Sequence, residues 1–210
     1  MKQKIELSHV QNLEFRVEDG ETPTITGYAA VFNSRSENLG GFVEIIKQGA
    51  FARSISAGAD VRALVDHDSS RIIGRTKSGT LKISEDARGL KIEVVPPNTT
   101  VGRDVVESIK RGDLDGMSFG FRVKKDDWKA VDGGMLRELH DVDLVDISVV
   151  SFPAYLATSV TARSVEEILA QGEESLNKLA AGRTLETFDR EVELRGKEFE
   201  ISIDNLPIFP

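Results

Sequence analysis

A nearly uninterrupted apolar run with one carboxylate inside it constrains this chain more than any other feature. Residues 144–152 read Leu-Val-Asp-Ile-Ser-Val-Val-Ser-Phe, and Pro153 closes the run. A short run so rich in β-branched residues is typical of a strand that is covered on both faces. A carboxylate buried in such a strand costs several kcal/mol unless it is paired or hydrogen-bonded. Asp146 therefore predicts a polar partner elsewhere in the chain.

The segment before this run predicts a second strand, because its polarity alternates strictly. Met117, Phe119 and Phe121 point to one side, whereas Ser118 and Gly120 point to the other. The turn sequence Asp-Gly-Gly at residues 132–134 separates the two strands. Shorter alternating or apolar runs predict further strands within residues 4–17, 25–31, 42–46 and 61–65, and a hairpin over residues 81–94.

Two helices are expected among these strands. Residues 101–109 have helical apolar spacing, with Asn98 or Thr99 as a candidate N-cap and Gly112 as the stop signal. Residues 48–57 predict a shorter helix. The expected fold class is therefore α+β and mainly antiparallel β, with a few helices around the sheet.

The chain changes character near residue 164. Residues 164–210 carry eleven acidic and five basic side chains, which is six of the eight net negative charges. The sequence Ser-Val-Glu-Glu at residues 164–167 is a capping box that opens a helix through Ile168 and Leu169. We therefore expect a strand-rich domain over residues 1–163, which the resemblance described below identifies as a β-barrel, and an acidic, helical C-terminal tail over residues 164–210.

The composition excludes several classes of function. The chain has no cysteine, which rules out disulfide scaffolds, thiolate metal sites and cysteine nucleophiles. A net charge of −8 argues against binding to nucleic acid or to anionic membranes. No stretch is apolar enough to cross a membrane, and the first residues lack the apolar region of a signal peptide. The expected location is the cytoplasm.

Three polar residues lie where the local pattern favours apolar ones: His67, Ser118 and Asp146. A hydroxyl, an imidazole and a carboxylate together form an activated serine nucleophile. Each residue also has a plainer interpretation. His67 can be a surface histidine, Ser118 can be the polar side of its strand, and Asp146 can pair with Arg122. The segment around Ser118 lacks the Gly-x-Ser-x-Gly elbow, which argues against an α/β-hydrolase.

Several motifs resemble the prohead (capsid maturation) serine proteases of tailed bacteriophages, a family similar in fold to herpesvirus assemblin. The specific blocks are Met-Ser-Phe-Gly-Phe at residues 117–121 and Asp-Ile-Ser-Val-Val-Ser-Phe-Pro-Ala at residues 146–154. Matching stretches precede them in order at residues 27–32, 46–51 and 63–68. The resemblance covers about residues 25–160. It implies an assemblin-like β-barrel.

The resemblance also implies site residues. Ser118 corresponds to the nucleophile and His67 to the general base. Asp146 corresponds to the third member, and we prefer it to the alternative, His140, because it occupies the motif position and shares a strand face with Leu144, Ser148 and Val150. Comparison with assemblin suggests an oxyanion donor near Ala154. No metal or organic cofactor is implied.

The resemblance implies a biological role. A prohead protease is packaged inside the immature capsid in the host cytoplasm, where it cleaves the scaffolding segment of the major capsid protein and then itself. The expected partners are therefore the capsid protein and other copies of the protease, and a homodimer is one state that the assemblin relatives suggest. The rival hypothesis is a non-catalytic scaffold or capsid-interaction protein that keeps the fold without the activity.

Overall fold

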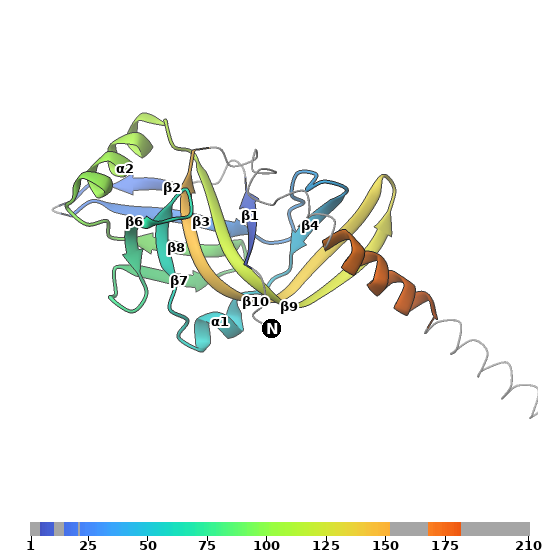
Figure 1. Ribbon diagram of the computed structural model, residues 1–210. Coiled ribbons are helices and arrows are strands. Elements are labelled where there is room, and N and C mark those ends of the chain that lie inside the picture. The colour runs from blue at the N-terminus through green and yellow to red at the C-terminus, as the bar shows by residue number, and fades with distance from the viewer. Residues whose placement is uncertain (1–4, 11–14, 21, 152–167, 182–210) are drawn as a thin grey trace, which may run out of the picture.

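The computed structural model describes residues 5–10, 15–20, 22–151 and 168–181, which form two β-sheets and a few helices (Figure 1). The larger sheet has six strands in the order β1-β9-β10-β5-β6, with β4 paired separately to β10. The smaller sheet has the order β2-β3-β8-β7. The larger sheet curls like half of a barrel (Figure 1). The predicted α+β, mainly antiparallel fold class is confirmed.

Two long strands form the spine of the larger sheet. β9 (Gly116–Val131) and β10 (Gly134–Val150) pair antiparallel along nearly their whole length, joined at the predicted Asp-Gly-Gly turn. Both strands are much longer than the sequence pattern predicted. The pattern missed their outer halves, which lie next to the turn at residues 124–131 and 134–141, because these residues are only partly apolar. Figure 1 shows this hairpin as the yellow-green and yellow ribbons that curve across the molecule.

The free edge of β10 is shared by two short strands. β4 (Phe42–Ile46) pairs parallel with residues 135–139, and β5 (Arg62–Val65) pairs parallel with residues 146–149. β6 (Asp68–Arg75) then pairs antiparallel with β5. On the other side of the hairpin, β1 (Glu6–Val10) pairs antiparallel with residues 117–121 of β9. β1 and β5 thus flank the inner half of the hairpin, the part of β9 and β10 that lies far from the turn, although they come from distant parts of the sequence.

The smaller sheet and the helices complete the core. The sheet consists of β2 (Phe15–Glu18), β3 (Thr24–Val31), β7 (Leu81–Glu85) and β8 (Gly89–Val94). Helix α2 (Thr100–Arg111) has the expected ends, since the Thr99 hydroxyl caps its first turn and Gly112 adopts a left-handed conformation after it. Helix α1 (Ala52–Ser56) is shorter than predicted. Buried side chains from both sheets form one core, which includes Phe51 and Phe119.

Part of the predicted tail contacts the body. Residues 168–181 are helical, as the capping box indicates, but the capping box itself lies outside the described residues. Gly172 is buried, and a Cβ on it would lie 2.7 Å from a ring carbon of Trp128 on β9. The glycine therefore allows the helix to pack closely on the outer half of the hairpin. Leu179, farther along this helix, is exposed. The domain boundary at residue 163 remains a prediction.

No helix in the described ranges is both long and apolar enough to cross a membrane.

Candidate active site

Ser118 lies on the side of β9 that faces away from the aromatic core. Its neighbour Phe119 packs edge-on against Phe51, with ring centroids 5.2 Å apart, and also contacts Phe121 at 5.2 Å. Because side chains alternate along a strand, burial of these rings directs Ser118 to the opposite face. Ser118 is nevertheless 0% exposed. The strict alternation of this segment is confirmed, but its polar face is covered rather than solvated.

His67 occupies a tight turn that follows strand β5. β5 and β6 are joined by Asp66 and His67, and both have positive φ angles, of 49° and 56°. Two such residues between paired strands form a turn of the type I′ kind, which usually contains Asn or Gly. Asp66 holds the turn, since its carboxylate accepts hydrogen bonds from the backbone N–H and the hydroxyl of Ser151. The turn directs the imidazole toward β9 and β10.

A β-bulge directs Asp146. The pairing of β10 with β9 shifts by one residue between Leu144 and Asp146, so Leu144 pairs with Phe121 and Asp146 pairs with Gly120. Leu144 therefore belongs to the core, whereas Asp146 points to the Ser118 side. The prediction that Leu144 and Asp146 share a face was wrong, because a bulge reverses alternation. A Cβ on Gly120 would lie 2.2 Å from Asp146 Oδ2, so glycine makes room for the carboxylate.

The three predicted residues meet at one place. His67 Nε2 lies 2.6 Å from Ser118 Oγ, and His67 Nδ1 lies 2.6 Å from Asp146 Oδ1. His67 and Asp146 are mostly buried, with side chains 12% and 11% exposed. An ionised carboxylate only accepts hydrogen bonds, so Nδ1 carries the proton shared with Asp146, and Nε2 of the neutral ring is left to accept. This tautomer is the one a base needs to take a proton from Ser118.

Ser148 is a fourth polar residue of this cluster, which the sequence analysis did not assign. Its hydroxyl donates to Asp146 Oδ1 at 3.0 Å and accepts from the backbone N–H of His67 at 3.3 Å. Its Oγ also lies 3.2 Å from His67 Nδ1. The residue is buried and stands directly opposite Ser118 in the ladder between β10 and β9. The only sequence signal for this residue was its position two residues after Asp146 in an apolar strand.

The alternative third member, His140, lies elsewhere. Its Nε2 is 2.9 Å from Asp127 Oδ2, in the outer half of the hairpin. It lies eight residues before Ser148 on β10, which is on the order of 25 Å along the strand at about 3.3 Å per residue. The geometry therefore separates His140 from Ser118 and favours Asp146. Ala154, the expected oxyanion region, lies outside the described residues.

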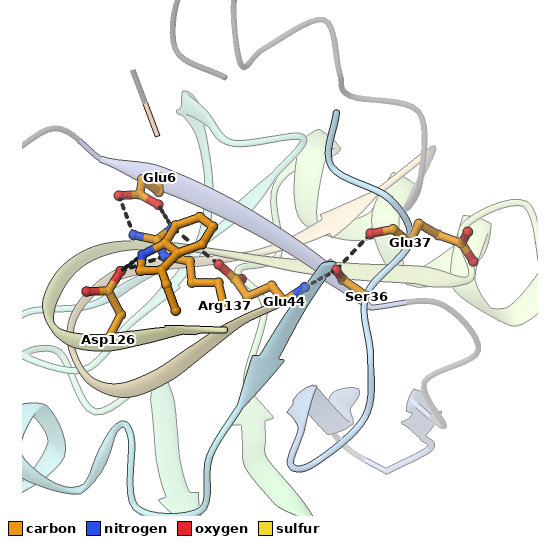
Figure 2. A network of polar contacts seen from close by, with 7 residues as sticks. Glu6, Ser36, Glu37, Glu44, Asp126 and Arg137 are labelled. Atoms are coloured by element: carbon orange, nitrogen blue, oxygen red, sulfur yellow. Dashed lines mark hydrogen bonds and ion pairs between the residues drawn. The ribbon is translucent and has the colours of Figure 1, made fainter. Parts of the chain in front are cut away.

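A second polar cluster lies on the outer half of the hairpin, where side chains from β1 and β4 contact Arg137 of β10 (Figure 2). Its centre is Arg137, which is 2% exposed. Arg137 Nε donates to Asp126 Oδ2 at 2.7 Å, and its terminal nitrogens contact Glu6 and Glu44, the latter at 3.4 Å. Burial, opposed by Arg137 and reinforced by Glu6, raises the pKa of Glu44 to about 7. Within the described residues, no group of three or more histidine, aspartate or glutamate side chains is placed to hold a metal ion.

Comparisons with known proteins identify the family of this chain. The family model described as caudovirus prohead serine protease matches residues 11–171. The chain belongs to this family. It is 29% identical over 154 residues to the prohead protease of Enterobacteria phage HK97, across 71% of this chain and 64% of the relative. The chain thus spans slightly less than two thirds of that relative's length. The range that the family model matches, residues 11–171, includes β9, β10 and the turn between β5 and β6.

A solved structure is also similar. The bacteriophage T4 capsid assembly protease aligns over 73% of this chain and all of its own chain, with a TM-score of 0.48 and 8% sequence identity.

Proposed function

We propose that this protein is a serine endopeptidase of capsid maturation, with Ser118 as nucleophile, His67 as general base and Asp146 as the residue that orients the base. The single observation that carries the proposal is the continuous contact from Asp146 through His67 to Ser118, at 2.6 Å for each step. Membership of the prohead serine protease family supports the same reaction. Three segments far apart in the sequence supply the three groups.

Acylation of Ser118 is the first half of the reaction. His67 Nε2 takes the hydroxyl proton while Ser118 Oγ attacks the carbonyl carbon of the scissile peptide bond. The resulting imidazolium is stabilised by the Asp146 carboxylate at Nδ1. The imidazolium then gives the proton to the departing amine as the C–N bond breaks, which leaves an ester on Ser118. Water, deprotonated by the same base, hydrolyses the ester and restores the serine.

Two further groups assist this chemistry. Ser148 is a positioning residue, because its hydroxyl connects the His67 backbone to the Asp146 carboxylate. A preorganised link of this kind keeps the imidazole aligned without rearrangement during the reaction. The tetrahedral intermediate also needs N–H donors for its oxyanion. The backbone near Ala154 remains our predicted donor.

The proposed substrate is the scaffolding segment of the major capsid protein, and the protease also cleaves itself. Cleavage takes place inside the prohead, in the host. The similarity to the prohead protease of phage HK97 and the membership of the prohead serine protease family support this role. Confinement within a capsid raises the effective concentration of substrate, so weak affinity for each cleavage site suffices.

Co-expression with the capsid protein of the same phage tests the proposal. Ser118→Ala should abolish processing of both the capsid protein and the protease, because the variant lacks the proposed nucleophile. A fluorophosphonate probe should also label Ser118 in the unmodified protein and not in the variant, as mass spectrometry of the labelled peptide can establish.

Ser84→Ala is the matched control, since Ser84 is an exposed serine on β7 in the other sheet. Its processing should equal that of the unmodified protein. Undiminished processing by folded Ser118→Ala would overturn the assignment. Absence of processing in every form, including the unmodified protein, would favour the non-catalytic scaffold hypothesis.

A further inference from the structure

Strand β1 covers the proposed nucleophile. Ser118 Oγ donates a hydrogen bond to the backbone carbonyl of Ser8 at 3.0 Å, and residues 6–10 of β1 pair with residues 117–121 of β9. Ser8 and Ser118 are both buried at this contact. A substrate carbonyl must come into contact with Ser118 Oγ before attack. With β1 in this position, Ser118 is not accessible to another peptide.

The hydrogen-bonding groups around the Ser118 hydroxyl also indicate that β1 blocks this serine. Ser118 has one hydroxyl proton, but two groups at hydrogen-bond distance compete for it: His67 Nε2 at 2.6 Å and the Ser8 carbonyl at 3.0 Å. The carbonyl only accepts, and Nε2 of a neutral imidazole also only accepts. A proton that Ser118 gives to Ser8 points away from the base. The Ser8 carbonyl therefore opposes activation of the serine.

β1 is held at its other end by the cluster around Arg137. The Glu6 carboxylate contacts both terminal nitrogens of Arg137, as Figure 2 shows. Between these two anchors, Leu7 lies beside Gly120, since its Cδ2 would be 3.3 Å from a Cβ at that position. Three successive residues of β1 thus contact three different features of the larger sheet: Arg137, Gly120 and Ser118.

The position of β1 in the sheet makes it exchangeable. β1 is at the edge of the larger sheet and pairs with β9 alone among the described strands. An incoming extended peptide could replace its main-chain hydrogen bonds with β9 one for one, as in other complexes formed by strand addition. Such a peptide would have to replace the Glu6–Arg137 contact and the side-chain hydrogen bond between Ser8 and Glu44.

We propose that the edge of β9 along residues 117–121 binds an extended segment of the substrate, and that β1 is the resting occupant of this site. The substrate segment runs antiparallel to β9 and carries an acidic side chain against Arg137. That side chain comes two residues before the residue whose carbonyl reaches Ser118, as Glu6 precedes Ser8. This inference rests on the proposed protease function and adds its substrate-binding edge and a preference for acidic peptides.

The choice of an acidic side chain follows from the burial of Arg137. When Glu6 leaves, the guanidinium loses its hydrogen bonds to that carboxylate. Water replaces them poorly, because Arg137 is almost completely buried. Leaving a buried charge under-paired is unfavourable. A substrate carboxylate at the same place restores these bonds, whereas a neutral side chain of similar size restores them only in part.

The rate at which a fluorophosphonate probe labels Ser118 tests the proposal in the full-length protein. Glu6→Gln removes the charge that anchors β1 and should increase the labelling rate about fivefold to tenfold, because β1 leaves Ser118 more often. Glu18→Gln is a matched control, since Glu18 is an exposed glutamate on β2, and it should leave the rate unchanged. An unchanged or lower rate in folded Glu6→Gln would overturn the proposal.

A peptide competition tests the site itself. The peptide Ile-Glu-Leu-Ser-His-Val, the sequence of residues 5–10, should slow the labelling of Glu6→Gln in a dose-dependent manner. The same peptide with Gln in place of Glu should require several times the concentration. Equal potency of the two peptides would contradict acidic recognition, and no inhibition by either would contradict the binding edge.

Hydrogen exchange of the unmodified protein keeps the proposal testable if Glu6→Gln does not fold. Amides of residues 6–10 should exchange at least tenfold faster than those of residues 117–121 that face β10. Equal protection of both strands would make β1 a permanent part of the sheet. Failure of these tests in a protein that processes its substrate through Ser118 would reject this inference alone and leave the proposed function standing.

Discussion

The inner and outer halves of the β9–β10 hairpin both bury charged groups, but they are built for different purposes. The inner half brings together Ser118, His67 and Asp146, in which one neutral imidazole links a hydroxyl to a carboxylate. The outer half surrounds Arg137 with Glu44, Asp126 and Glu6. Of the two clusters, only the inner one places a serine hydroxyl at contact distance from an imidazole nitrogen.

The comparison shows why a perturbed pKa is a poor guide to catalysis in this protein. Glu44, whose pKa burial raises to about 7, lies in the outer cluster and contacts no nucleophile. Structural ion clusters perturb pKa values as strongly as active sites do. The two clusters differ in which donors and acceptors they bring together. Strand β1 contacts both, since Glu6 contacts the outer cluster and Ser8 the inner one.

The largest expected effect tests whether the inner cluster alone is catalytic. Asp146→Asn should lower the rate of Ser118 acylation on the order of 10³–10⁴-fold, because an amide no longer holds the imidazole in the productive tautomer. His140→Ala, in the outer half, should change the rate less than twofold. A large loss for His140→Ala with little change for Asp146→Asn would reverse the assignment of the third member. Both rates can be measured by fluorophosphonate labelling.

A smaller effect is expected for the positioning residue. Ser148→Ala removes the two hydrogen bonds that join the Asp146 carboxylate to the His67 backbone. The alignment lost is worth about 1.4 kcal/mol, so kcat should fall about tenfold while KM stays the same. Ser54→Ala is the matched control, because its buried hydroxyl accepts a hydrogen bond from the Leu144 backbone away from the site. Both variants should lose similar stability in denaturant unfolding, but only Ser148→Ala should lose kcat. Equal kcat in the two variants would reduce Ser148 to a structural role.

The smallest effect on catalysis is expected in the outer cluster, where the effect should appear in stability. A carboxyl whose pKa rises from 4.5 to about 7 on folding binds a proton in the folded state that the unfolded state has released. This contribution to the free energy of unfolding is therefore full below pH 4.5 and declines as the pH rises toward 7. Its total size is about 3 kcal/mol.

Glu44→Gln removes this titration. The difference in free energy of unfolding between the variant and the unmodified protein should shift by about 3 kcal/mol in favour of the variant between pH 4.5 and pH 8. Urea unfolding at several pH values measures this difference. Parallel stability curves for the two proteins would contradict the assignment of the titration to Glu44.

Local sequence signals predicted some elements well. Helix α2 was correct at both ends, since a threonine cap and a left-handed glycine act within one turn of the helix. The alternation of residues 117–121 also held, because it reflects one aromatic core face. The three residues of the inner cluster were named from residue types and from the family resemblance, and the structure brings them into contact.

Other features depended on long-range contacts and left no local signal. Strand β6 was missed because Asp66 and His67 form a two-residue turn without the glycine that usually marks one in a sequence. The bulge before Asp146 reverses alternation, and it follows from the pairing with β9 rather than from the apolar run itself. The outer halves of β9 and β10 carry mixed polarity, so their length was not evident either.

The sequence by itself determined the class of fold and the identity of the reactive groups, because periodicity and residue type act over a few neighbouring positions. The tertiary structure decided which way those groups face. It placed His67 over Ser118 through a turn and Asp146 over Gly120 through a bulge. It also placed the Ser8 carbonyl against the Ser118 hydroxyl, a contact between residues 110 positions apart. Such contacts depend on how strands pair across the whole chain, and strand pairing is decided by the assembled core.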